Sequence, residues 1–337
     1  MKEEDQNETR EKAKWPRLIL LLLGISIFIM FLKNVPLGEV WSILTILNTN
    51  VILIIMSLTV ISILFKAWRW KYLVKKTMKT DISTFFSFNS VIAGVAAGSL
   101  FPGRIDVAKP LLLKKRYYTK LTEGFSLLFV ERVFDLISII FIFGISGLFV
   151  KNLSYKITPV LFIFPLFLLI FLVGFLREPG RYGRLFEKIV SFIPLSGNIQ
   201  TKIISFARRF INVSLETKRQ KIFYGTFMLS FLSGLFEVIR LYYVLTYFGI
   251  SISLPMTGVI FAVVVIVSVL SLIPGGIGVN ELSAAGMILL FTPGSNSVIV
   301  TSAVLLNRFF AYYILIIIGS ISLMIFKNKK KTMIKDD

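Results

Sequence analysis

Charged side chains lie inside several of the most apolar stretches of this chain, where they could bind a charged ligand or one another. They are Glu131, Arg132, Asp135, Glu237, Arg240, Glu281 and Arg308. Placing an ionised side chain at the centre of a bilayer costs roughly 2.5–3.5 kcal/mol on insertion scales. The presence of seven such residues therefore predicts that they pair with one another, line a polar pathway through the membrane, or do both.

Two kinds of chemistry suit these residues. Arginine binds phosphate through two hydrogen bonds and stays charged when it is desolvated, so Arg132, Arg240 and Arg308 are candidates for holding an anionic head group. Glu131 and Asp135 are four residues apart and share one face of a helix, where they could take a proton or a cationic group. The alternative is a set of buried ion pairs that only hold the fold together. Arg240 could also extend its charge to the membrane interface.

Two Pro-Gly turns interrupt apolar stretches and add further candidates. The turn residues are Pro102 and Gly103 in the first, and Pro274, Gly275, Gly276 and Gly278 in the second. Proline and glycine end a helix and allow a tight backbone turn. A helix that starts after such a turn offers free N–H groups to an anion. Arg104 and Asp106, which follow the first turn, are also counted among the candidate binding residues. Taken alone, each turn could be an ordinary helix end.

The two turns correspond to each other within an internal repeat. SLFPGRIDV at 99–107 returns as SLIPGGIGV at 271–279, and the surrounding segments match in the same order. Arg69 corresponds to Arg240, and Arg132 to Arg308, while Asn307 stands where the first copy has Glu131. Pro-Gly interruptions at corresponding positions of two apolar halves are typical of a transporter with a binding site near the membrane midplane.

The composition predicts a membrane protein without metal or cofactor chemistry. Of 337 residues, 55% are hydrophobic, more than a soluble chain of this length could bury. The net charge of +20 comes from Lys and Arg between apolar runs, which favours attraction to anionic lipids and not to nucleic acid. The chain has no Cys and no His, which excludes disulfides, thiolate metal sites and imidazole bases. We expect no metal and no cofactor.

Hydropathy predicts an all-α polytopic protein with about eight membrane segments. Six full transmembrane helices are expected at about 18–32, 51–66, 124–150, 158–176, 222–248 and 299–326, and the stretches 82–101 and 254–291 are broken by Pro and Gly. The first span is expected to be retained, because no small-residue cleavage site follows it.

Basic residues predict the sidedness of the loops. The stretches 66–79, 104–120, 177–221 and 327–337 are rich in Lys and Arg, so they and the N-terminal tail 1–17 are expected in the cytoplasm. The connection 177–221 could form amphipathic helices on the inner leaflet or be a solvated connector.

This sidedness predicts an inverted-topology repeat. Since basic stretches flank 82–101 on the same side, that segment must be a re-entrant hairpin, with 82–118 as its full extent, and 254–291 must enter from outside. The repeats 18–150 and 158–326 would then have opposite orientations. Re-entrant backbone is tolerated only when it is buried or lines a wet cavity, so the two tips should meet within the fold.

The motifs PGRID, VERVFD and LIPGGIGVNE, followed by the Asn-Arg pair of LLNRFF, resemble the membrane region of the lysylphosphatidylglycerol synthase family, which is flippase-like. The similarity covers nearly all of 18–326. In that family the membrane part is associated with lipid movement between leaflets, and a separate soluble domain aminoacylates phosphatidylglycerol. The resemblance implies the translocating part alone, with Arg104, Glu131, Arg132, Asp135, Glu281 and Arg308 as site residues. The sequence departs from the family pattern at two positions. Asp106 follows the first turn where the family usually has Gly-Glu, and Asn280 stands where a basic residue is frequent before Glu281. Both differences bear on which head group the site would recognise.

The resulting hypothesis is a non-enzymatic lipid transporter of the cell membrane. Its cargo would be an anionic or aminoacylated phospholipid or a polyprenyl-phosphate-linked lipid, moved by alternating access. One alternative is an accessory subunit of envelope or glycan assembly that works with a separate lipid-modifying enzyme or glycosyltransferase. A membrane-embedded lipid phosphatase or a lysyltransferase-associated enzyme is disfavoured, because PGGIGVNE offers no hydroxyl or imidazole nucleophile before Ser283. The sequence carries no signature of an oligomeric state.

Overall fold

The computed structural model describes residues 37–45, 47–101, 106–150 and 220–333, together with isolated positions before residue 34 and between 170 and 204. Every regular element among these residues is a helix, as the all-α prediction requires. Part of the expected span 18–32 lies outside the described residues, as does most of the span 158–176 and of the connection 177–221. So do Pro102, Gly103 and Arg104.

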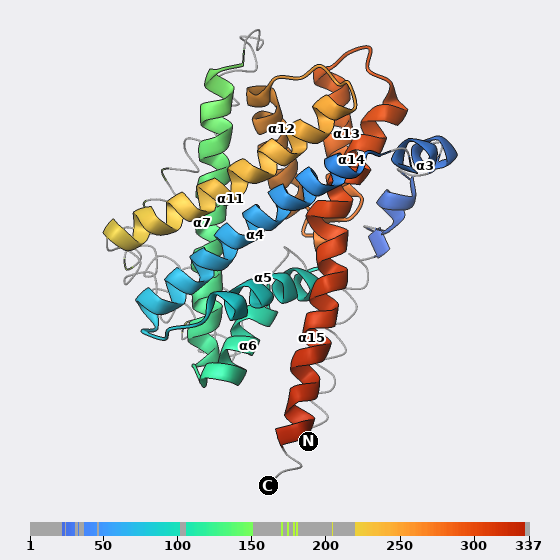
Figure 1. Ribbon diagram of the computed structural model, residues 1–337. Coiled ribbons are helices and arrows are strands. Elements are labelled where there is room, and N and C mark those ends of the chain that lie inside the picture. Colours follow the sequence, from blue (N-terminus) through green and yellow to red (C-terminus); the bar gives the residue numbers. More distant parts are fainter. Residues whose placement is uncertain are drawn as a thin grey trace, which may run out of the picture. The chain divides into compact units, whose positions relative to one another are not determined.

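Figure 1 shows the described helices in their order along the chain. They are α3 (Leu37–Thr45), α4 (Thr49–Thr77), α5 (Thr84–Gly98), α6 (Ala108–Tyr117), α7 (Leu121–Leu148), α11 (Gln220–Tyr247), α12 (Leu254–Leu270), the 3-10 turn η2 (Pro274–Gly276), α13 (Val279–Phe291), α14 (Ser297–Arg308), the π-helix η3 (Phe309–Tyr313) and α15 (Ile314–Met333).

Four helical stretches of the described chain are long and apolar enough to cross a membrane. They are Thr49–Thr77, Lys221–Tyr247, Pro274–Phe291 and Ser297–Met324. Helix α7 is also 28 residues long, but it carries Glu131, Arg132 and Asp135 near its centre. Several apolar helices in one chain define a multi-pass α-helical membrane protein.

One helix boundary differs from the sequence prediction. Helix α4 does not end near residue 66 but continues to Thr77, so the first part of the expected basic loop 66–79 is helical. Arg69 is therefore buried in a helix and does not lie in a water-facing loop. The helix can continue because distant carboxylates, described below, neutralise this charge.

The predicted interruption of 254–291 is present. Helix α12 ends at Leu270 and α13 begins at Val279, with the 3-10 turn between them. Gly275, Gly276 and Gly278 all have positive φ, a conformation in which a side chain is strained. In the first hairpin, α5 ends at Gly98 and α6 begins at Ala108.

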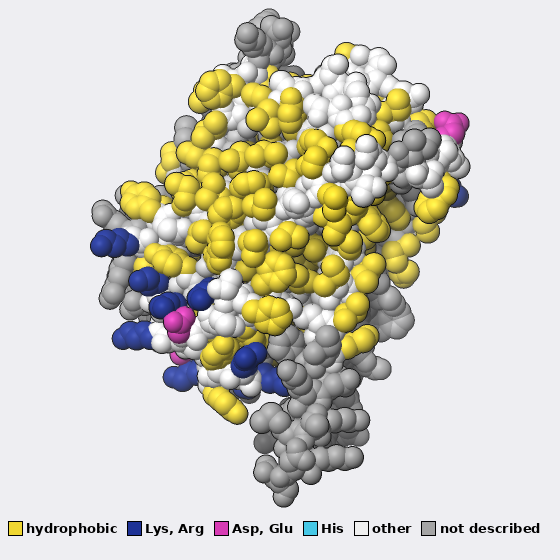
Figure 2. Space-filling model, in the orientation of Figure 1, with side chains coloured by type: hydrophobic (Ala, Val, Ile, Leu, Met, Phe, Trp, Pro, Cys, Tyr) yellow, Lys and Arg dark blue, Asp and Glu magenta, His cyan; other side chains and the backbone are white. Residues whose placement is uncertain are grey.

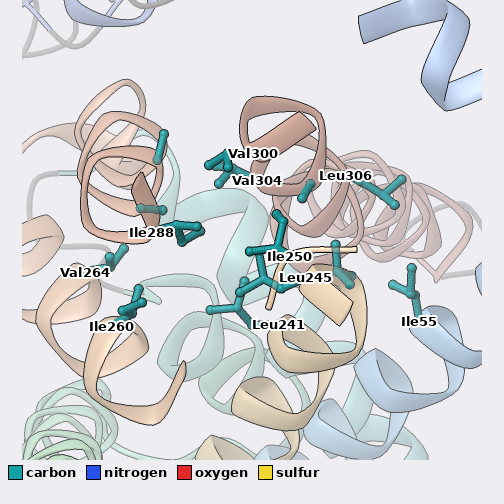
Figure 3. Packing of buried hydrophobic residues seen from close by; sticks show 14 of the residues in the cluster. Ile55, Leu241, Leu245, Ile250, Ile260, Val264, Ile288, Val300, Val304 and Leu306 are labelled. Carbon is teal, nitrogen blue, oxygen red and sulfur yellow. The ribbon is translucent and has the colours of Figure 1, made fainter. Parts of the chain in front are cut away.

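The chain divides into two compact units, each built from parts of both sequence halves. Unit 1 comprises residues 1–60, 92–106 and 237–337, and unit 2 comprises 61–91 and 107–236. Unit 1 has a continuous apolar core in which Ile55, Leu241, Ile260, Ile288 and Val304 meet from five different helices (Figure 3).

Unit 2 is held by close helix contacts. Helix α6 packs against α7, where Gly124 leaves room for the ring of Pro110. Gly225 likewise accommodates the Tyr72 ring, whose hydroxyl donates to the Lys221 carbonyl at 2.9 Å. Phe134 and Phe223 pack edge to face with centroids 5.3 Å apart. Small residues allow helices to approach closely where lipid provides no hydrophobic driving force.

Hydrophobic side chains cover much of the visible surface, and Lys and Arg gather where α4 ends and α11 begins (Figure 2). Large apolar residues such as Trp41, Leu53, Phe85 and Leu148 are exposed. This much exposed apolar surface is compatible with a protein whose solvent is lipid.

Candidate functional site

Unit 2 contains a buried cluster of charges centred on Glu131. Arg69 of α4 donates to Glu131 Oε1 through Nη2 at 2.7 Å and through Nε at 3.1 Å. Its Nη1 donates to the carboxylate of Asp135 and to Ser230 Oγ, the latter at 2.7 Å. Lys109 of α6 reaches the other oxygen of Glu131, with Nζ 2.9 Å from Oε2. One carboxylate thus ties three helices together.

This cluster is closed on one side and open on the other. Arg69 and Glu131 are 1% and 0% exposed, whereas Arg132 and Asp135 are partly exposed. Arg132 Nη1 donates to Asp135 Oδ2 at 3.2 Å. A buried ion pair is stable only when its charges are matched, and loss of one partner leaves an uncompensated charge. The inner pair therefore suits a structural role, and the outer pair suits contact with a ligand.

Lys109 is a residue whose role sequence reasoning missed, because it was counted only as one of the basic residues of 104–120. Lys109 is buried in α6, and its ammonium group lies 5.4 Å from the centre of the Trp70 ring. The repeat contains a signal for this role, because the counterpart of Lys109 is Glu281, a residue singled out for its charge.

Unit 1 contains a second cluster, which fixes the second Pro-Gly turn. Glu281, in the first turn of α13, accepts from the backbone N–H of Gly278 through Oε2 at 2.8 Å. Its Oε1 accepts from Arg308 Nε and from the Tyr313 hydroxyl, both at 2.9 Å. Arg308 also donates to the Gly275 carbonyl at 2.6 Å. Glu281 and Arg308 together clamp the turn to the end of α14.

The π-helix η3 supplies the rest of this clamp. It begins directly after Arg308 and contains Tyr312 and Tyr313. The Arg308 guanidinium lies 4.0 Å from the centre of the Tyr312 ring. A Cβ atom at Gly275 would collide with the Tyr312 hydroxyl, so the turn requires glycine for space as well as for its φ of +66°. Single π-turns occur frequently at functional sites.

Arg240 occupies a third buried position, also in unit 1. It is 4% exposed; its Nε donates to Asn307 Oδ1 at 3.1 Å and its Nη1 to Thr59 Oγ1 at 3.4 Å. Both acceptors are neutral. Within the described residues, Arg240 forms no ion pair with a carboxylate.

The contacts of Arg69 and Arg240 correspond position by position. Arg69 binds Glu131 and Ser230, and Arg240 binds Asn307 and Thr59. Asn307 is the repeat counterpart of Glu131, and Thr59 and Ser230 are separated by the same 171 residues as the two arginines. Ser62 and Ser233, also 171 apart, lie with their hydroxyl oxygens 3.2 Å from each other.

The remaining predicted residues are distributed between the units. Asp106 is buried just before α6, and Glu237 is half-buried in α11, both in unit 1. Arg104 lies outside the described residues. The structure thus groups Glu131, Arg132 and Asp135 in unit 2. It adds Arg69 and Lys109 there, and adds Tyr312, Tyr313 and Asn307 to the candidates of unit 1.

Several long apolar helices together with buried charged side chains define an α-helical multi-pass membrane protein. The chain belongs to the family described as the lysylphosphatidylglycerol synthase TM region, whose family model matches residues 17–319.

Curated relatives with similar sequences are archaeal membrane proteins. A UPF0104 membrane protein of Methanothermobacter thermautotrophicus is 29% identical over 269 residues, covering 75% of this chain and 76% of the relative. One from Methanocaldococcus jannaschii is 27% identical over 335 residues, covering 93% and 96%. One from Pyrococcus horikoshii is 21% identical over 332 residues, covering 93% and 98%. The similarity therefore extends over most of each chain.

Proposed function

We propose that this protein moves a lipid head group between the leaflets of the cell membrane without catalysing a reaction. The observation that carries the proposal is the pair of arginine-centred sites, Arg69 and Arg240, at corresponding positions of two sequence repeats. Membership of a family whose membrane region is linked to lysylphosphatidylglycerol adds to this support. Buried charges in an apolar protein mark a path for a polar group.

The reciprocal contacts favour two repeats of opposite orientation. Arg69 contacts Ser230, and Arg240 contacts Thr59, so each arginine contacts the repeat counterpart of the residue that the other arginine contacts. Ser62 meets its own counterpart, Ser233. This reciprocity is what a twofold relation produces between two copies of one unit. Together with the basic stretches expected in the cytoplasm, it supports an inverted repeat with both termini inside.

The charge distribution favours a lipid that carries a phosphate. Arg132 lies at the partly exposed edge of the charge cluster in unit 2, and Arg240 in unit 1 donates to neutral acceptors. Arginine is well suited to bind phosphate. Anionic or aminoacylated phospholipids and polyprenyl-phosphate-linked lipids share this group. During alternating access, the repeats would rock around the site while the acyl or prenyl chains remain in the bilayer.

Reconstitution tests this function. The purified protein is placed in liposomes containing a fluorescent phospholipid or a lipid-linked sugar, and exposure of the label is followed with dithionite or a lectin. We expect faster leaflet exchange than in protein-free liposomes, and a clear loss of rate in Arg132→Gln.

The matched control for that variant is Lys75→Gln, which removes a cation from an exposed ion pair with Asp81. Equal rates in the wild type, both variants and protein-free liposomes would overturn the proposal. That result would favour an accessory role beside a lipid-modifying enzyme or a glycosyltransferase.

A further inference from the structure

The two arginine sites differ in charge although their contacts correspond. Arg69 binds two carboxylates, Glu131 and Asp135. The positions that correspond to them in the second repeat are Asn307 and Ala311. Both negative charges that neutralise Arg69 are thus missing from the copy that contains Arg240, while the arginine itself is kept.

Arg240 is therefore a buried cation with neutral acceptors. Its hydrogen bonds go to an amide oxygen and a hydroxyl oxygen, and its Nη2 makes no hydrogen bond to the described residues. Burying a guanidinium that donates only to neutral acceptors costs several kcal/mol, which an entering anion would offset.

The neighbouring charges of unit 1 do not remove this positive character. Arg308 acts repulsively on Arg240, and Glu237, three residues earlier in α11, acts attractively. Arg308 is engaged by Glu281, the Gly275 carbonyl and the Tyr312 ring. Arg240, by contrast, donates to the neutral acceptors Asn307 Oδ1 and Thr59 Oγ1.

We propose that Arg240 binds the phosphate group of the transported lipid, and that Asn307 is the residue that keeps this site available. The inference rests on the proposed function for the identity of the ligand as a lipid. The corresponding Arg69 site is already occupied by its own carboxylates and binds no ligand phosphate. The two repeats thus contain one structural copy and one ligand-binding copy of the same arginine.

Asn307→Asp is the substitution that separates these roles. It replaces an amide by a carboxylate of nearly the same shape and gives Arg240 the partner that Arg69 has. The new ion pair competes with any phosphate for the same guanidinium. We expect a folded protein of unchanged or higher thermal stability whose apparent affinity for an anionic lipid falls by at least about tenfold, which corresponds to about 1.4 kcal/mol.

The matched control is Asn296→Asp, which adds the same charge at the start of the same helix. Asn296 is exposed and caps α14 by accepting from the Val298 N–H at 2.8 Å, a role that aspartate fills equally well. Thr59→Asp is a second test variant, because it places a carboxylate at the other acceptor of Arg240. It keeps the test decisive if Asn307→Asp does not fold.

The experiment measures ligand-induced thermal stabilisation of the purified protein in neutral detergent, so it does not depend on transport. The ligands are phosphatidylglycerol, diacylglycerol and inorganic phosphate. Stabilisation of the wild type and of Asn296→Asp by phosphatidylglycerol, absent with diacylglycerol and lost in Asn307→Asp, supports the proposal. A response to inorganic phosphate alone, lost in the same variant, overturns the lipid assignment and leaves an anion site.

Equal stabilisation of the wild type and Asn307→Asp by phosphatidylglycerol would overturn the site itself. The proposed function is judged separately by leaflet exchange. Exchange that persists in Asn307→Asp contradicts Arg240 as the binding residue but leaves transport intact. If the wild type binds the lipid but shows no leaflet exchange, the transport function is contradicted and Arg240 remains the binding residue.

Discussion

Lys109 of α6 binds Glu131 of α7 with 2.9 Å between Nζ and Oε2, and both side chains are buried. The same carboxylate also receives Arg69 from α4. A lysine in the middle of a basic stretch thus serves as an internal tie between helices. The consequence is that its removal should affect stability and not only surface charge.

Replacing Lys109 with Met should lower the free energy of unfolding by roughly 3–5 kcal/mol, because Glu131 then loses one of its two buried counter-charges. The measurement is thermal or denaturant unfolding of the purified protein in mild detergent. Lys75→Met is the comparison, since Lys75 forms an ion pair of similar length with Asp81 but is 54% exposed. Surface pairs contribute little, so its transition should not move. Equal effects of the two substitutions would contradict the assignment of Lys109.

Gly275→Ala should destabilise the second hairpin turn by about 1–3 kcal/mol, because alanine at φ +66° is strained and its Cβ meets the Tyr312 hydroxyl. The double variant Gly275→Ala/Tyr312→Phe should recover part of the loss, since it removes the colliding oxygen. The unfolding midpoints of the single and double variants separate the cost of the backbone strain from the cost of the collision with the Tyr312 hydroxyl.

The control for Gly275 is Gly286, which lies within α13 and has open space where a Cβ would be. Gly286→Ala should leave stability unchanged or raise it by about 0.5–1 kcal/mol. A destabilisation equal to that of Gly275→Ala would show that the turn has no special requirement for glycine.

The chain has no cysteine, which makes the contact between Ser62 and Ser233 directly testable. The variant Ser62→Cys/Ser233→Cys should form an internal disulfide on mild oxidation, detected by mass spectrometry of the proteolysed protein. Ser57→Cys/Ser233→Cys is the comparison, because Ser57 lies in the same helix α4 and its hydroxyl donates to the Leu53 carbonyl of that helix. Cross-linking of the comparison pair at the same rate would remove the support that this contact gives to a twofold relation.

The sequence predicted the elements whose signals are local. Pro274 and the glycines after it predicted the break between α12 and α13, and the charges of Glu281 and Arg308 marked residues that do meet. The role of Lys109 was missed because counting basic residues assigns sidedness to a whole stretch and does not show that one side chain turns inward. Only Glu131, 22 residues further on, reveals it.

Other features depend on contacts far along the chain. The extension of α4 through Arg69 relies on Glu131, 62 residues away. The π-helix η3 follows Arg308 and presents Tyr313 to Glu281, 32 residues earlier. No local sequence signal near Phe309 predicts that the helix becomes a π-helix there. Such features are set by tertiary pairing of charges, which local hydropathy cannot report.

The central claim, that the protein itself moves lipid, is tested most directly by leaflet exchange of a fluorescent phosphatidylglycerol in liposomes containing only this protein. If the claim is right, dithionite destroys nearly all of the fluorescence, because inner-leaflet lipid reaches the outside. Protein-free liposomes should lose only their outer-leaflet signal. The same partial loss in protein-containing liposomes, at verified reconstitution and with each candidate lipid, would contradict the account.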